Sequence, residues 1–210
     1  MQSVGVIDST MACCKDLLKV FTWIGALEDI KYWPLDLPES EVQRPADHSQ
    51  RIATKLVSIV QQMMARDRKT PPIVSDDLQD LLTDRHLEDY RVCNTIAQHV
   101  ALMCLSRYNL GSDRKHPSVA NSVSSVIKLA GATSKHVGLH PSICLTTALF
   151  VAGYYAERER KEDIKKLLEI QYQVTKSRNT QKTLDILHRI WSAVPSPQDA
   201  GGKRGYFAGE

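Results

Sequence analysis

Apolar residues recur at helical spacing through most of the chain, and prolines or glycines separate the apolar stretches. The first stripe consists of Leu17, Val20, Phe21, Ile24 and Leu27. Residues three or four apart share one face of a helix, so this stripe predicts an amphipathic helix. Because Asp8 and Ser9 are suitable N-caps, we expect the helix to run from there to about Tyr32.

A second apolar face follows a polar connector that contains Pro34 and Pro38. Its members are Ile52, Leu56, Ile59, Val60 and Met63. The helix should end before Pro71-Pro72, because proline cannot continue a helix. We expect a short acidic helix from Ser75 after it.

The stretch from His86 to about Tyr108 is apolar nearly all round between Val92 and Leu105. A helix with this pattern is buried on most of its sides, so it should lie at the centre of the domain. The next inward stripe consists of Val119, Val123, Val126, Ile127 and Ala130.

Three more helices are expected, over residues 142–156, 159–176 and 179–194, with Asn179 as the N-cap of the last. No stretch shows sustained β alternation. The pattern therefore predicts an all-α domain, an irregular bundle of about seven or eight helices over residues 1–194. Residues 195–210 hold two prolines and four glycines without an apolar period, and we expect a disordered tail.

Charge and cysteine content limit the classes of partner. The 27 basic and 24 acidic residues alternate along the chain, so the net charge of +3 does not indicate a nucleic-acid surface. The five cysteines form no spaced framework and are odd in number, which favours a reducing compartment. Neither a signal peptide nor an apolar run long enough to span a bilayer is present. These features predict a cytosolic or nuclear protein without a membrane partner.

Histidines are the first candidates for a metal-binding or catalytic site. His136 and His140 are four apart, but Gly138 between them breaks the helical register that a shared zinc ion would need. His86 lies among carboxylates. We interpret them as acidic residues that stabilise the positive N-terminal end of a helix capped by Asp84, in preference to an acid-base catalytic site. His99 lies inside the apolar central helix, where a hydrogen-bonded core histidine is the more common case.

Nucleophilic chemistry finds no support either. The sequence has no Gly-x-Ser-x-Gly elbow, no His-Glu-x-x-His and no Cys-x-x-Cys. Tyr154 and Tyr155 could face a ligand pocket between helices, although packing at a helix end is the simpler interpretation. The mixed charges from Glu157 to Asp163 are typical of a solvated helix start. We assign no catalytic, cofactor-binding or metal-binding residue.

Three blocks, in order along the chain, carry a family resemblance. The first is Asp8 to Leu27, with Met11-Ala12 and a leucine-rich helix. The second is Tyr90 to Val126, which includes His116-Pro117. The third starts at Phe150-Val151-Ala152-Gly153 and passes Glu159-Arg160, Asn179 and Ile186-Leu187 to Trp191. Together they resemble the C-terminal part of the fungal-specific regulatory domain of zinc binuclear cluster transcription factors.

The resemblance implies a helical regulatory module over residues 1–194, in which Gly153 is a close turn, Asn179 a cap and Trp191 a core anchor. The sequence departs from the family at Thr146-Thr147-Ala148, where Trp-Pro is usual, and at Tyr154-Tyr155. The six cysteines of the zinc cluster are also missing from these residues, so direct DNA binding by this chain is not expected.

The preferred hypothesis is a non-enzymatic, transcription-regulator-like module that acts through protein contacts, with a small effector as a further option. Its partner would be a full-length zinc cluster transcription factor, and its location the nucleus, with the cytoplasm as the alternative. The competing hypothesis is a small-molecule-processing enzyme with a helical pocket lined by His99, Tyr154 and Tyr155. An enzyme predicts polar groups that converge on one cavity, whereas a module predicts an exposed apolar patch.

Overall fold

The computed structural model describes residues 5–8, 10–31, 39–75, 82–109, 116–134 and 144–193. Within these ranges the chain forms α1 (Lys15–Lys31), α2 (Glu39–Lys69), α3 (Asp84–Asn109), α4 (Pro117–Ala132), α5 (Leu145–Tyr155), α6 (Arg158–Thr175) and α7 (Arg178–Ser192). Two short strands, β1 (Val6–Ile7) and β2 (Ile73–Val74), accompany them. The predicted all-α class is confirmed, with seven helices and one very small sheet in the described part of the chain.

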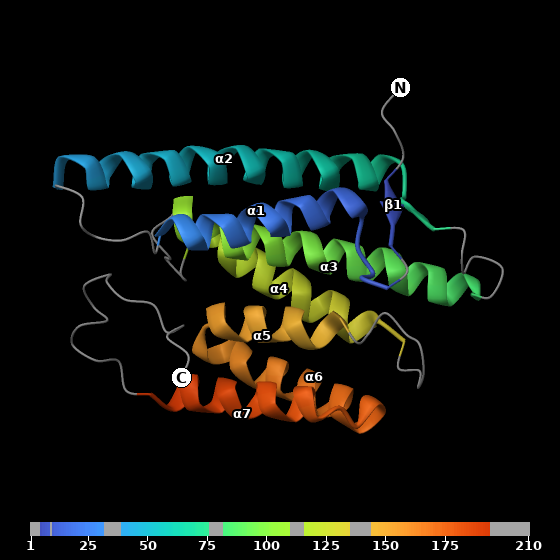
Figure 1. The fold of residues 1–210 in the computed structure, drawn as a ribbon. Coiled ribbons are helices and arrows are strands. Elements are labelled where there is room, and N and C mark those ends of the chain that lie inside the picture. Colours follow the sequence, from blue (N-terminus) through green and yellow to red (C-terminus); the bar gives the residue numbers. More distant parts are fainter. Residues whose placement is uncertain are drawn as a thin grey trace.

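The helix α3 is the central element, as its apolar sequence predicted. It packs against α1, α2, α4, α5 and both strands. Figure 1 shows α1 and α2 together on one side of the molecule and α5, α6 and α7 on the other, with α3 and α4 between them. Ile96, Met103 and Leu105 of α3 are almost completely buried. Each Å² of apolar surface that is buried stabilises the fold by about 25 cal/mol. This layer is therefore the main source of stability.

The N-terminal segment differs from the prediction. Val6 and Ile7 pair in parallel with Ile73 and Val74, so β1 lies beside the chain that leaves α2. Strands of two residues are too short to show alternation, which explains why the sequence pattern missed them. Asp8 does not cap a helix: its Oδ1 accepts hydrogen bonds from the backbone N–H groups of Thr10 and Met11, and α1 begins only at Lys15.

Two other predicted caps were also wrong. Thr83, not Asp84, caps α3, because its Oγ1 accepts the backbone N–H of His86 at 3.3 Å. At α7 the N-cap position is Ser177, and Asn179 lies inside the helix. Asparagine and aspartate are frequent at all the early helix positions, so the type of residue alone does not fix which one is the cap.

The contact between α5 and α7 explains two residues of the family resemblance. Gly153 lies in α5 against Leu187 of α7, and a Cβ at Gly153 would stand only 2.7 Å from Cδ1 of Leu187. Trp191 donates its Nε1–H to the carbonyl oxygen of Gly153 at 3.0 Å. The ring of Trp191 is only partly buried, so this residue closes the edge of the core and does not anchor its centre. Gly153 is a helical contact point, not a turn.

The predicted helix after Ser75, the first residues of the 142–156 helix and the tail at 195–210 lie wholly or mainly outside the described residues.

Candidate functional site

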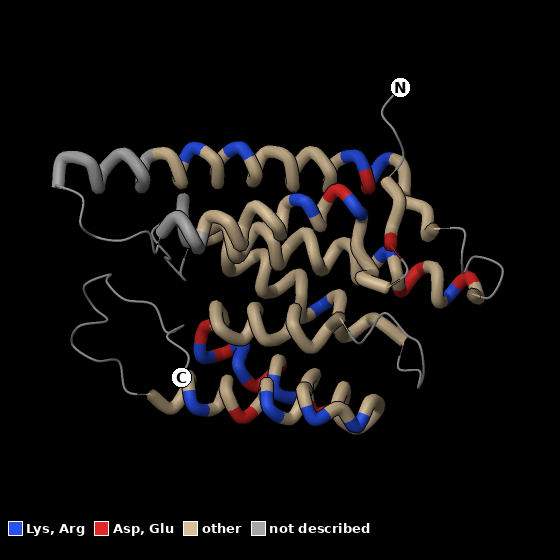
Figure 2. Tube along the Cα trace, in the orientation of Figure 1, with Lys and Arg blue, Asp and Glu red and all other residues tan. Residues whose placement is uncertain are grey.

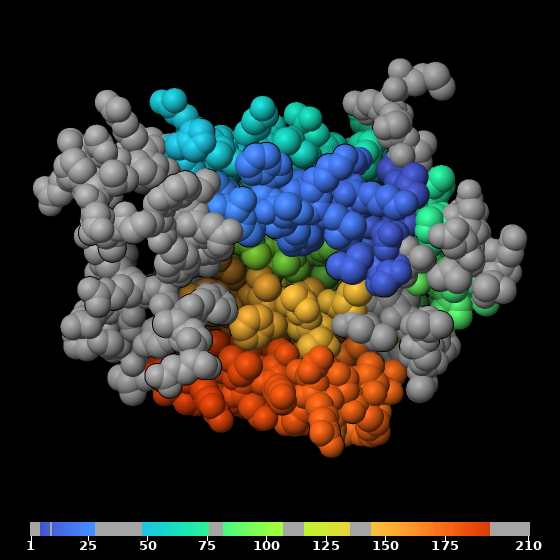
Figure 3. Space-filling view, in the orientation of Figure 1, coloured from blue at the N-terminus to red at the C-terminus, as the bar shows by residue number. Residues whose placement is uncertain are grey.

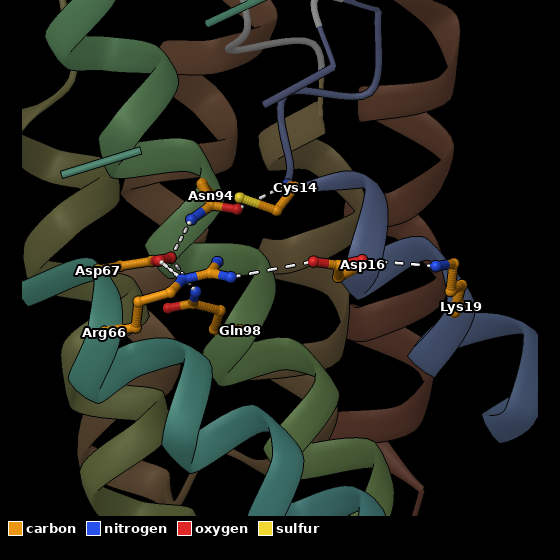
Figure 4. Close-up of polar contacts among 7 residues, drawn as sticks. All are labelled: Cys14, Asp16, Lys19, Arg66, Asp67, Asn94 and Gln98. Atoms are coloured by element: carbon orange, nitrogen blue, oxygen red, sulfur yellow. Dashed lines mark hydrogen bonds and ion pairs between the residues drawn. The ribbon is translucent and has the colours of Figure 1, made fainter. Parts of the chain in front are cut away.

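A buried polar network joins the beginning of α1 to α2 and α3 (Figure 4). The carboxylate of Asp67 is its centre: Asn94 donates to Oδ2 at 3.0 Å and Gln98 donates to the same atom at 2.7 Å. The neighbouring Arg66 donates Nε–H to Oδ1 at 2.9 Å. Asn94 in turn accepts the backbone N–H of Cys14 at 2.7 Å. Each of these polar groups therefore compensates the desolvation of another.

The network extends to the surface along the contact between α1 and α2. Nη1 of Arg66 lies 3.9 Å from Oδ2 of Asp16, and Lys19 lies 3.5 Å from the other oxygen of Asp16. Nη2 of Arg66 is buried without a hydrogen-bond partner. It is covered by Gly5, where an added Cβ would collide with Nη2. Gly5 therefore packs directly against this guanidinium, and the network is a clamp that joins α1, α2 and α3.

Two smaller polar contacts hold α3 against α4. His99 lies 3.3 Å from Oγ of Ser122, and burial, with a smaller contribution from the positive charge of Arg68, lowers the pKa of His99. Asp89 accepts hydrogen bonds from both the backbone N–H and the hydroxyl of Ser134. Both groups are used to join helices, so the core interpretation of His99 fits its surroundings.

Tyr154 and Tyr155, the other two residues of the enzyme hypothesis, contact each other at the end of α5. Tyr155 is buried, and its ring meets that of Tyr154 edge to face at a centroid distance of 5.2 Å. His86 lies 3.2 Å from Oγ1 of Thr83 at the start of α3. His136 and His140 lie outside the described residues.

Cysteine thiols gather where the segment before α1 meets α3 and α5. Sγ of Cys144 lies 3.5 Å from the carbonyl oxygen of Met11. Burial raises the pKa of Cys13 to about 11 and that of Cys14 to about 12, and it also raises the pKa of Cys93. Thiols in this state are poor nucleophiles. Among the described residues, no group of three or more histidine, cysteine or acidic side chains is placed to hold a metal ion.

An open groove of 730 Å³ lies between α6 and α7. Its apolar lining comes from Leu168, Ile170, Tyr172, Val174 and Leu184. Lys166, Glu169, Gln173, Thr180 and Gln181 supply polar groups around it. The sequence interpretation missed this groove, because its lining combines the buried Leu168 and Thr180 with more exposed residues of both helices and no motif marks it. None of His99, Tyr154 and Tyr155 lines it.

Several large apolar side chains are exposed on the helices. Trp23 of α1 is 52% exposed and Ile59 of α2 is 37% exposed. Ile170 of α6 and Ile186 of α7 are exposed to a similar degree. Ile59 was predicted on the buried face of its helix, and it lies instead at the border of that face. Exposed apolar residues that lie next to one another are a mark of interaction surfaces.

The fold defines a helical domain in which buried polar contacts join the helices and several large apolar side chains are exposed. The family model described as "Fungal specific transcription factor domain" matches residues 2–199, and the chain belongs to this family. It is thus a transcription factor regulatory domain, of a type that is typically non-enzymatic. No curated protein and no solved structure gives a significant match to the chain. Within the described residues no helix is long and apolar enough to cross a membrane.

Proposed function

We propose that this chain is a non-enzymatic module that changes the activity of a transcription factor through protein contacts. The family match over residues 2–199 is the observation that carries the proposal. The partner is a full-length zinc cluster transcription factor, and the place of action is the nucleus. The module acts by binding one conformation of its partner more tightly than another, which shifts the population of that partner.

The placement of the titratable groups supports this proposal over the enzyme hypothesis. An acid-base catalyst must stand within hydrogen-bond reach of a substrate in a pocket. Asp67 is already occupied by three donors, and His99 lies against Ser122 between two helices. Within this proposal, the zinc cluster of the partner makes the sequence-specific DNA contacts.

Transcript profiling in the native organism tests the proposal. Deletion of the gene should change a defined set of transcripts, and the wild-type gene should restore them. Genes that carry His99→Gln or Tyr154→Phe should restore them equally well, since neither side chain does chemistry in a non-enzymatic module. Restoration by wild type but by neither variant, at equal protein levels, would support the enzyme hypothesis. A fluorescent fusion should collect in the nucleus.

The groove between α6 and α7 supports the second part of the proposal, a small effector. Its volume falls in the range of small-molecule sites, roughly 300–1,000 Å³. Its lining suits a molecule with an apolar body and a few hydrogen-bonding groups. Metabolite fractions from the native organism should raise the unfolding temperature of the wild-type chain, and Leu184→Glu should abolish that rise. An equal rise in the variant would remove the groove as the effector site.

A further inference from the structure

Trp23 of α1 and Ile59 of α2 are large exposed apolar side chains on two helices that contact each other. The two helices lie side by side and run in opposite directions (Figure 1). Asp16 and Arg66 contact each other across them, with Nη1 and Oδ2 3.9 Å apart. That contact fixes the register of one helix against the other.

Seven residues make almost two full helical turns, so positions seven apart lie on the same side of a helix. Trp23 lies seven residues after Asp16, and Ile59 lies seven residues before Arg66. Because the helices are antiparallel, both steps lead in the same direction in space. The register therefore puts Trp23 and Ile59 at one level of the two helices, on the sides that carry Asp16 and Arg66, as an apolar pair.

The pair is open to solvent although both residues are large and apolar. Trp23 is 52% exposed and Ile59 is 37% exposed. Figure 3 shows α1 and α2 adjoining at the surface of the upper part of the molecule. The buried clamp around Asp67 ties the segment before α1 to the end of α2 and to α3, beside the surface that carries the pair.

Basic residues lie on both sides of this pair, and one of them, Lys19, is 3.5 Å from the exposed carboxylate of Asp16. Lys19 lies one turn before Trp23, and Lys55 lies one turn before Ile59; in antiparallel helices these two lysines flank the pair at opposite ends. Between residues 48 and 69 the exposed charged side chains of α2 are all basic. They are Arg51, Lys55, Arg68 and Lys69. Figure 2 shows the Lys and Arg positions along α2. The one acidic residue of this stretch, Asp67, has a side chain that is only 7% exposed.

We propose that the surface formed by Trp23, Ile59, Lys19 and Lys55 is a docking site for an acidic amphipathic helix of a partner protein. Apolar residues of that helix cover Trp23 and Ile59, and its carboxylates face the lysines. A second copy of this chain would bring basic surfaces together, which disfavours self-association. A phosphate backbone would leave the apolar pair uncovered, which disfavours nucleic acid. This inference rests on the proposed function, because it names the chemistry of the partner.

Binding of a synthetic peptide tests the inference directly. The probe is a fluorescent helical peptide with leucines three and four apart and glutamates elsewhere, and the readout is fluorescence anisotropy with the full chain. The double variant Trp23→Ser with Ile59→Ser should weaken binding about tenfold or more, as loss of a buried aromatic anchor does. Ile186→Ser, on the 46% exposed Ile186 of α7, is the matched apolar control and should leave binding unchanged.

Charge is tested in the same assay. Lys55→Glu should weaken binding and reduce its dependence on salt, whereas Lys182→Glu on the exposed face of α7 should do neither. A peptide with lysine in place of glutamate should not bind. Circular dichroism checks that each variant folds, which is expected because all substituted side chains are exposed.

Three results would overturn the inference. They are equal binding by the double variant, equal binding of the lysine peptide, and tighter binding of duplex DNA or of phosphatidylserine vesicles through Trp23. The peptide assay does not depend on transcript profiling. Failure of the docking-site inference can therefore be told apart from failure of the proposed function. A chain that restores transcripts but binds no acidic peptide keeps the proposed function and loses this surface.

Discussion

Replacement of Gly153 by alanine should destabilise the domain although alanine favours helices. The new Cβ would lie 2.7 Å from Cδ1 and 3.0 Å from Cδ2 of Leu187, and 3.4 Å from Cγ2 of Ile164. Carbon atoms prefer separations of about 3.5–4.0 Å. Leu187 and Ile164 are both completely buried, so neither side chain has free space to move into. Helix α7 must therefore shift away from α5, and the hydrogen bond from Trp191 to the Gly153 carbonyl must lengthen.

The size of the effect follows from two opposing contributions. Overpacking of a core costs about 1–3 kcal/mol. Alanine in place of glycine inside a helix raises the free energy of unfolding by about 1 kcal/mol. Gly25 in α1 provides the matched control, because an added Cβ there meets nothing within 4 Å. Gly25→Ala should stabilise the chain, and the free energies of unfolding of the two variants should differ by about 1–3 kcal/mol.

Urea unfolding monitored by circular dichroism measures both free energies. A double-mutant cycle adds Leu187→Ala, which alone should cost about 2–5 kcal/mol because it opens a cavity in the core. In that background Gly153→Ala should no longer destabilise, since the colliding methyl groups are gone. The reasoning is refuted if Gly153→Ala and Gly25→Ala stabilise the chain equally, because the contact between α5 and α7 would then not depend on glycine.

Three further predictions concern the polar groups and the thiols. Asp67→Asn should cost about 3–5 kcal/mol in urea unfolding, because it removes the buried carboxylate that accepts from Arg66, Asn94 and Gln98. Asp16→Asn, at an exposed position, should cost less than about 1 kcal/mol, and equal costs would contradict the clamp. The pKa of His99 is lowered from 6.5 by burial, so the unfolded chain binds the proton first and stability should fall as the pH drops below 6.5. Stability curves of His99→Gln should show a smaller fall as the pH drops below 6.5, and identical curves would exclude this role. At pH 8, alkylation followed by peptide mapping should find Cys13 and Cys14 protected in the folded chain, because their pKa values are about 11 and 12; rapid labelling of either would contradict their burial.

The sequence pattern predicted the helices well because helical periodicity is a local property. The stripes that begin at Leu17 and at Val119 do face the core, and α3 is central as its apolar sequence indicated. Trp23 is not a member of the first stripe, which agrees with its exposed position. What failed was the placement of boundaries and caps, such as the start of α1 after Asp8, where several neighbouring residues can serve equally well.

The polar clamp was beyond the reach of the sequence for a different reason. Asn94 and Gln98 are four apart on an apolar helix, and that spacing was a visible signal of a shared polar partner. The partner, Asp67, lies 27 residues before Asn94, and no periodicity connects the two. The pairing of Trp23 with Ile59 is equally non-local, since it depends on the register that the contact between Asp16 and Arg66 sets.

The central claim, that this chain regulates transcription through a protein contact on the surface of α1 and α2, is tested most directly by transcript levels in cells that carry surface variants. In a deletion strain, the wild-type gene and the Ile186→Ser gene should restore the affected transcripts. The gene with Trp23→Ser and Ile59→Ser should fail to do so at equal protein level and equal nuclear location. Full restoration by this double variant would contradict the account.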